Sequence, residues 1–121
     1  MKMRPITDRL IEMTKEGKHL SRGYVRAKIK AVETRERRAP VHLQRVKGCM
    51  DRIVEHAASK NVWIALECRR GYEEIPSERE LPSLLDELNS EQVGYWHDFG
   101  HSQIKENLGQ SVRIWKERFD E

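Results

Sequence analysis

Apolar residues recur at helical spacing through the first half of the chain, and this pattern predicts three helices. The first is expected over residues 8–16, with Gly17 as its stop signal. The second begins after Ser21, and Pro40 is expected to end it. The third, over residues 41–59, has the most regular apolar face: Leu43, Val46, Met50, Ile53, Val54 and Ala57. Residues 1–60 are therefore predicted to be helical.

The second half of the chain changes to a strand pattern. Residues 62–67 and 93–98 are short apolar runs, and the first has the composition of a strand that is covered on both faces. Between them Ser77 and Glu80 form a capping box, and a leucine-rich stretch follows it. Strand, helix and strand in this order predict a βαβ unit with parallel strands, and the unit with its following helix is assigned to residues 61–109. Residues 110–121 are expected to form a terminal helix.

Each predicted strand ends in a carboxylate. Because side chains alternate along a strand, Glu67 shares a face with Trp63, and Asp98 shares one with Trp96. In parallel α/β units the ligand site lies at the carboxyl ends of the strands. We therefore expect Glu67 and Asp98 to lie close together there.

Two carboxylates with a nearby imidazole favour a divalent metal. His101 follows Asp98 by three residues, and carboxylate oxygen with imidazole nitrogen suits manganese, zinc, iron or cobalt. A metal so held can polarise a sugar carbonyl or hydroxyl while Glu67 moves a proton. The alternative is structural: Glu67 pairs with Arg69 or Arg70, and Asp98 caps the next helix.

Composition narrows the class of protein. The chain has 121 residues, which fits one domain, and 36% of them are charged, with a mean hydropathy of -0.82. Its 23 basic residues face 20 acidic ones, so nucleic-acid binding is not favoured, although seven basic residues cluster over 22–38. That cluster is interpreted as a solvated helix face.

Cys49 and Cys68 form no metal-binding or disulfide pattern, and no apolar run predicts a signal peptide or a membrane span. A cytoplasmic protein is expected.

Four segments resemble one enzyme family. Residues 65–69 (ALECR), 73–76 (EEIP), 94–101 (GYWHDFGH) and 104–109 (IKENLG) are similar, in order and spacing, to the sugar phosphate isomerase/epimerase family. That family has the xylose-isomerase-like TIM barrel, and its members commonly carry Asp-Thr-Gly-His after a central strand. Here Phe99 stands in the threonine position. The resemblance spans about residues 41–109 and implies an α/β fold: a partial (β/α)₈ barrel, since a full one needs about 250 residues.

The resemblance also implies roles for individual residues. Glu67 would be a metal ligand and the catalytic acid/base, and Asp98 a second ligand. His101 would be either a third metal ligand or a substrate contact, and Arg69 would contact the substrate. The implied cofactor is a divalent metal: manganese, magnesium, zinc or cobalt.

Three functions follow from these observations. The leading one is a metal-dependent isomerase or epimerase that acts on a sugar or sugar phosphate and is incomplete as an isolated chain. The second is a non-catalytic assembly module of that fold, and the third is an abasic-DNA repair enzyme related to endonuclease IV. Because two strands leave Trp63 and Trp96 exposed, self-association or a complementing barrel fragment is expected.

Overall fold

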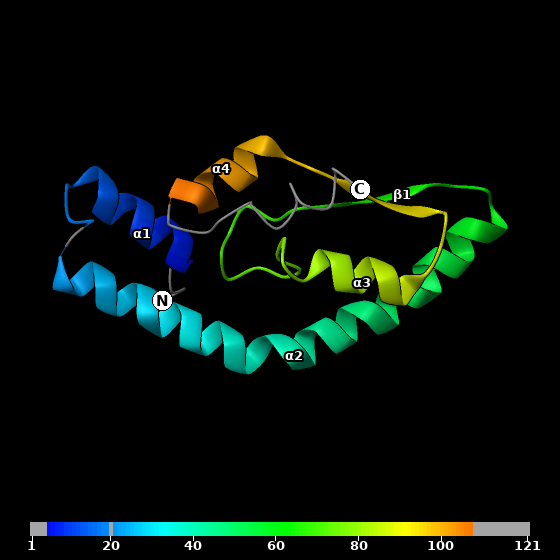
Figure 1. Ribbon diagram of the computed structural model, residues 1–121, viewed down its shortest axis with the longest axis horizontal. Helices are drawn as coiled ribbons and strands as arrows, with labels where there is room; N and C mark the ends of the chain where they lie inside the picture. The colour runs from blue at the N-terminus through cyan, green and yellow to red at the C-terminus, as the bar shows by residue number, and fades with distance from the viewer. Residues whose placement is uncertain (1–4, 20, 108–121) are drawn as a thin grey trace.

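The computed structural model describes residues 5–19 and 21–107, which form four helices and two strands. In chain order these are α1 (Ile6–Lys15), α2 (Arg22–Ser59), β1 (Ile64–Glu67), α3 (Leu81–Leu88), β2 (Val93–Trp96) and α4 (Phe99–Asn107). Figure 1 shows the long helix α2 along one side, with the strands and the other helices on its inner side. The predicted terminal helix over 110–121 lies outside the described residues.

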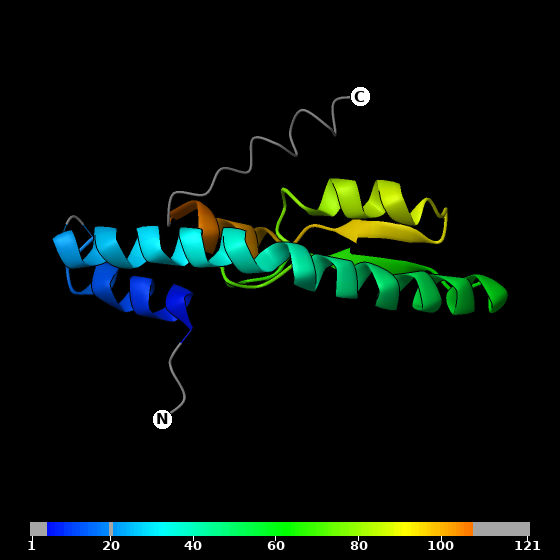
Figure 2. The same cartoon turned by 90° about the horizontal axis from the view of Figure 1, so that it is seen from below.

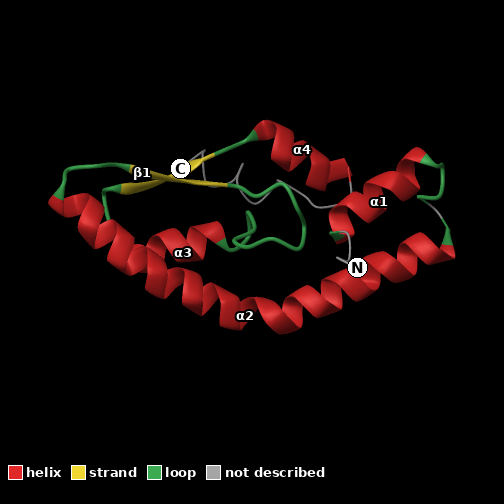
Figure 3. Ribbon diagram, turned by 180° about the vertical axis from the view of Figure 1, so that it is seen from behind, coloured by secondary structure: helices red, strands yellow, loops and turns green. Residues whose placement is uncertain are grey.

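Helix α2 corrects the prediction that Pro40 ends a helix. The 38-residue helix continues through Pro40, which lies inside it. Proline cannot donate a hydrogen bond to the carbonyl of Glu36, so it kinks a helix at this position. The helix nevertheless continues where tertiary contacts fix the segments before and after the proline. Figures 1 and 3 show α2 bent near its middle, with α1 and α3 on the concave side. Pro40 is exposed while the adjacent Ala39 is buried, which places the missing bond on the solvent side.

The two strands form a parallel pair, as the sequence predicts. Residues Ile64 to Glu67 lie opposite Val93 to Trp96 in register, and α3 forms the connection between them. Helix α3 begins at Leu81, after the capping box, and Pro82 lies in its first turn, where proline is tolerated. In the box itself the backbone N–H of Ser77 donates to the Glu80 carboxylate at 2.7 Å. The fold is therefore mixed α/β with a βαβ unit.

Only one face of the sheet is covered by described residues, which corrects the expectation of a strand buried on both faces. Leu66 and Tyr95 pack against Cys68 and Leu81 on the side of α3. On the other face Trp63 is 69% exposed and Trp96 64% exposed. Figure 1 shows α3 and the second half of α2 on the same side of the two strands, and Figure 2 shows these ribbons from below. The predicted exposure of these two tryptophans is confirmed.

A second small core joins the two N-terminal helices. Leu10 of α1 and Tyr24 of α2 are buried against each other, with Ile6, Met13 and Ala27 around them. Ser21 caps α2, because its hydroxyl accepts the backbone N–H of Tyr24 at 3.2 Å. No helix in the described part of the chain is long and apolar enough to cross a bilayer.

Candidate functional site

Asp98 lies between the end of β2 and the start of α4, and it caps that helix. Its Oδ1 accepts the backbone N–H of His101 at 2.8 Å, and its carbonyl accepts the N–H of Ser102 at 3.0 Å. The N–H of His101 holds the pKa of Asp98 below its ordinary value of 3.8. The structural alternative considered for Asp98 is thus confirmed, and its Oδ2 is left to face Glu67 and the imidazole.

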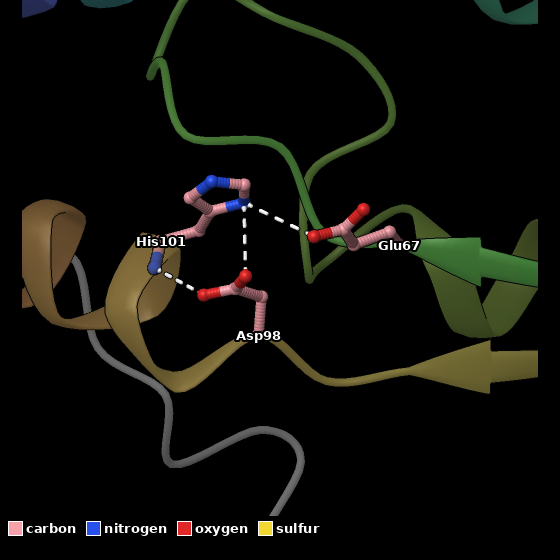
Figure 4. A group of neighbouring side chains, drawn as sticks. All are labelled: Glu67, Asp98 and His101. Atoms are coloured by element: carbon pink, nitrogen blue, oxygen red, sulfur yellow. Dashed lines mark hydrogen bonds and ion pairs between the residues drawn. The ribbon is translucent and has the colours of Figure 1, made fainter.

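Glu67, Asp98 and His101 come together at the carboxyl ends of the strands, and we call them the strand-end cluster. The Nδ1 atom of His101 lies 3.6 Å from Oε1 of Glu67 and 3.8 Å from Oδ2 of Asp98 (Figure 4). One ligand atom from each residue lies within 4.8 Å of the others. The side chains are 48%, 33% and 34% exposed in that order, so a solute can reach them. The predicted convergence of these residues is confirmed.

The imidazole of His101 is held by a backbone group. Its Nδ1 lies 2.9 Å from the carbonyl oxygen of Cys68, and a carbonyl can only accept, so Nδ1 carries the proton in this arrangement. Figure 4 shows the other ring nitrogen directed away from both carboxylates. As it lies, His101 is a hydrogen-bond donor, and it can become a ligand only if Nδ1 loses its proton or the ring turns. The two carboxylates fit a divalent cation without rearrangement of this kind.

Arg69 does not join the strand-end cluster. Its guanidinium pairs with Glu74 at 2.7 Å, and the neighbouring Arg70 pairs with Asp8 at 2.9 Å. The prediction that one of these arginines pairs with Glu67 is therefore wrong, because each has an acidic partner elsewhere. The assignment of Arg69 as a substrate contact stays a prediction.

A buried polar cluster beneath the strand ends has no counterpart in the sequence predictions; it consists of Glu78, Lys105, Ser102 and Cys68. The Lys105 ammonium contacts both the Glu78 carboxylate and the carbonyl of Arg69, and Lys105 is 3% exposed. The Ser102 hydroxyl donates to Glu78 at 3.3 Å, and the Cys68 thiol lies 3.4 Å from the carbonyl of Asp98. This cluster ties α4 to the backbone just after Glu67. Ser102 and Lys105 share a helix face, which is the signal that could have found them.

Arg35 was also missed, because it lies within the basic segment interpreted as a solvated face. Its side chain is only 12% exposed and donates to both oxygens of Glu80 at 2.7 Å. It also donates to the carbonyls of Tyr72 at 2.9 Å and Glu74 at 3.1 Å. Burial raises the pKa of Glu80, but the Arg35 guanidinium and the hydrogen bonds from Ser77 together hold that pKa below the ordinary 4.5. Arg35 thus fastens the loop after β1 to α2.

Comparison with known proteins adds no assignment. No family model, no curated protein and no solved structure matches this chain. The likeness to the sugar phosphate isomerase/epimerase family therefore depends on the residues quoted above, and the barrel assignment stays a prediction.

Proposed function

We propose that the strand-end cluster binds a divalent cation and serves proton transfer on a sugar or sugar phosphate, as in an isomerase or epimerase. The observation that carries the proposal is the meeting of two carboxylates and an imidazole at the ends of two adjacent parallel strands. No lysine or arginine among the described residues forms an ion pair with Glu67 or Asp98, and the His101 imidazole is the group that lies near both carboxylates. Carboxylate oxygens together with an imidazole nitrogen are a donor set that suits a divalent cation.

Each residue has a distinct part in this proposal. Glu67 and Asp98 would hold the cation, which when bound polarises the sugar oxygen next to the reacting carbon. Glu67, the most exposed of the three, would take the proton from that carbon and return it to the neighbouring carbon or the opposite face. Asp98 is fixed by its helix cap and keeps its negative charge to low pH. His101 would donate Nδ1–H to the substrate if that N–H leaves the Cys68 carbonyl, or become a third ligand if the ring turns or the proton moves from Nδ1 to Nε2.

Additional groups are needed to complete such a site. A divalent cation takes four to six or more ligands, so water, substrate or another chain would supply the rest. We propose that the βαβ unit is part of a (β/α)₈-type barrel, which a second copy or a complementing fragment completes. The exposed tryptophans of the uncovered sheet face support this proposal.

Cation binding is the direct test. Titration of Mn²⁺ into the chain, followed by calorimetry and by the loss of the free-ion paramagnetic resonance signal, should show a site that Glu67→Gln and Asp98→Asn weaken at least about tenfold. Glu55→Gln, which removes an exposed carboxylate from α2, is the matched control and should change nothing. Absence of Mn²⁺, Zn²⁺, Co²⁺ and Mg²⁺ binding by the unaltered chain would refute the cation role.

His101→Gln separates the two roles of the imidazole. If His101 is a ligand, this variant weakens Mn²⁺ binding. If it contacts only substrate, binding is unchanged. Proton transfer itself can be followed without knowing the substrate, by deuterium entry at carbon in a panel of ketoses and ketose phosphates in D₂O. Deuterium entry that persists in Glu67→Gln would exclude Glu67 as the transferring group.

An assembly role is the second candidate, and the apolar exposure of the sheet favours it. Trp63, Trp96 and Phe99, which is 81% exposed, present large side chains to solvent near the strands. Sedimentation velocity should detect self-association that Trp63→Ser reduces and Glu67→Gln leaves intact. A monomer at high concentration would contradict this role.

A further inference from the structure

A cavity separate from the strand-end cluster lies between α1, the first half of α2 and the loop after β1. Its volume is about 750 Å³, and none of Glu67, Asp98 and His101 lines it. Pockets that take small organic ligands have about 300–1,000 Å³ and combine an apolar lining with a few polar groups. Its size therefore suits a ligand of more than a few atoms.

The lining provides an apolar surface contributed by all three segments. Ile6 comes from α1, Ala27, Ala31 and Ala39 come from α2, and Ile75 comes from the loop. Each of these residues is half-buried or buried, so the apolar atoms lie inside rather than at the rim. A ligand with an apolar part can bury this surface, which contributes a binding free energy of about 25 cal/mol per Å² of apolar area removed from water. A purely ionic ligand lacks this contribution.

The exposed residues that line the cavity are mostly cationic. Arg9, Lys30 and Arg38 have no ion-pair partner in the part of the chain that the structure describes. Of the two carboxylates in the lining, that of Glu74 pairs with Arg69 at 2.7 Å. The Glu73 carboxylate accepts the Thr7 hydroxyl at 2.6 Å but keeps its negative charge, because a hydroxyl is neutral. The three cations therefore outnumber the one remaining carboxylate, and an excess of positive charge surrounds the apolar lining.

We infer that this cavity binds a single-chain amphiphilic anion, such as an alkyl carboxylate or an alkyl phosphate. The alkyl chain contacts the apolar lining, and the anionic head lies among Arg9, Lys30 and Arg38, whose own methylene stems extend the apolar surface. Lys30 and Arg38 belong to the basic segment that the sequence analysis interprets as a solvated helix face, and the inference gives these two residues a ligand-binding role. The inference is independent of the cation site and of the proposed isomerase activity.

Calorimetric titration of the full chain with three probes below their micelle concentrations tests the inference: decanoate, decyl phosphate and decyltrimethylammonium. We expect one molecule of either anion to bind, and the cationic probe to bind at least about tenfold more weakly. The two anions distinguish a carboxylate from a phosphate preference. Inorganic phosphate alone should not bind, because it lacks the alkyl chain.

Two double variants locate the site. Lys30→Ala/Arg38→Ala removes two charges from the cavity, and Arg26→Ala/Arg37→Ala removes two from exposed positions of the same helix outside it. The first pair should weaken anion binding at least about tenfold, while the second leaves it within about twofold. Equal weakening by both pairs, equal affinity for the cationic probe, or no binding of either anion would overturn the inference. Helix content by circular dichroism verifies that both variants fold.

Discussion

Two polar groups of residues lie next to each other at the ends of the strands, yet they have opposite surroundings. Glu67 and His101 of the strand-end cluster are half exposed, whereas the residues that follow them, Cys68 and Ser102, are buried. The buried polar cluster is internally paired, and the exposed one holds two carboxylates near one imidazole. A shift of one residue along the strand or the helix therefore leads from the strand-end cluster, whose side chains a solute can reach, to the buried polar cluster, whose side chains hold the backbone in place.

Removing one partner of the buried ion pair should have the largest effect. Lys105→Met leaves the Glu78 carboxylate buried without its cation, and we expect the free energy of unfolding to fall by about 3–5 kcal/mol. Urea denaturation measures this. The double variant Lys105→Met/Glu78→Met removes both charges and should recover most of the loss. If the double variant is as unstable as the single one, the pair is not the cause.

Loss of the helix cap should be smaller. Asp98→Ala removes the acceptor of the His101 N–H, so the free energy of unfolding should fall, though by less than in Lys105→Met. Asp98→Asn keeps an oxygen acceptor and should be more stable than Asp98→Ala, while it removes the negative charge that a cation needs. Urea denaturation and Mn²⁺ titration of both variants separate capping from cation binding. Equal stability of the two variants would contradict the capping role.

Lowering the pH should remove the stability that the Asp98 carboxylate contributes. The pKa of Asp98 is lower in the folded chain than its ordinary 3.8, so the unfolded chain binds more protons in this range. The stability that this carboxylate contributes is therefore present above about pH 3.8 and is lost as the pH falls through its folded pKa. Denaturation midpoints of the unaltered chain and of Asp98→Asn should converge once the pH falls below the folded pKa of Asp98. Parallel curves would show that Asp98 does not contribute.

Glu67→Gln should have the smallest effect on stability. The Glu67 side chain is 48% exposed and lies at a strand end, so the free energy of unfolding should change by less than about 0.5 kcal/mol. The same change should weaken cation binding at least about tenfold if the proposed function holds. A large loss of stability would show that Glu67 has a structural role, as the residues of the buried polar cluster have.

The strand-end cluster was predictable because its residues follow local rules. Strand alternation and the parallel βαβ order bring Glu67 and Asp98 to one edge, and the Asp-x-x-His spacing gives the helix cap. The buried cluster was not predictable in this way. Lys105 lies on a short polar helix, and its partner Glu78 comes from a distant loop, so only the folded chain shows that the lysine is enclosed.

The same distinction explains the error at Pro40. Proline is a local stop signal, but contacts far along the chain hold both halves of α2. Arg35, just before Pro40, is fixed to the loop after β1, and Val54 and Ala57 are buried in the later half. Tertiary contacts therefore override the local preference.

The uncovered face of the sheet gives the chain an optical reporter. Trp63 and Trp96 are both more than half exposed, and they come from adjacent strands. Indole fluorescence moves to shorter wavelength when water around the ring is replaced by apolar groups. Binding of a second copy or a complementing fragment to this face should therefore shift the emission maximum to shorter wavelength. The measurement is made in Trp115→Phe, which removes the emission of the third tryptophan. The emission spectrum of the unlabelled chain thus becomes a titratable measure of assembly.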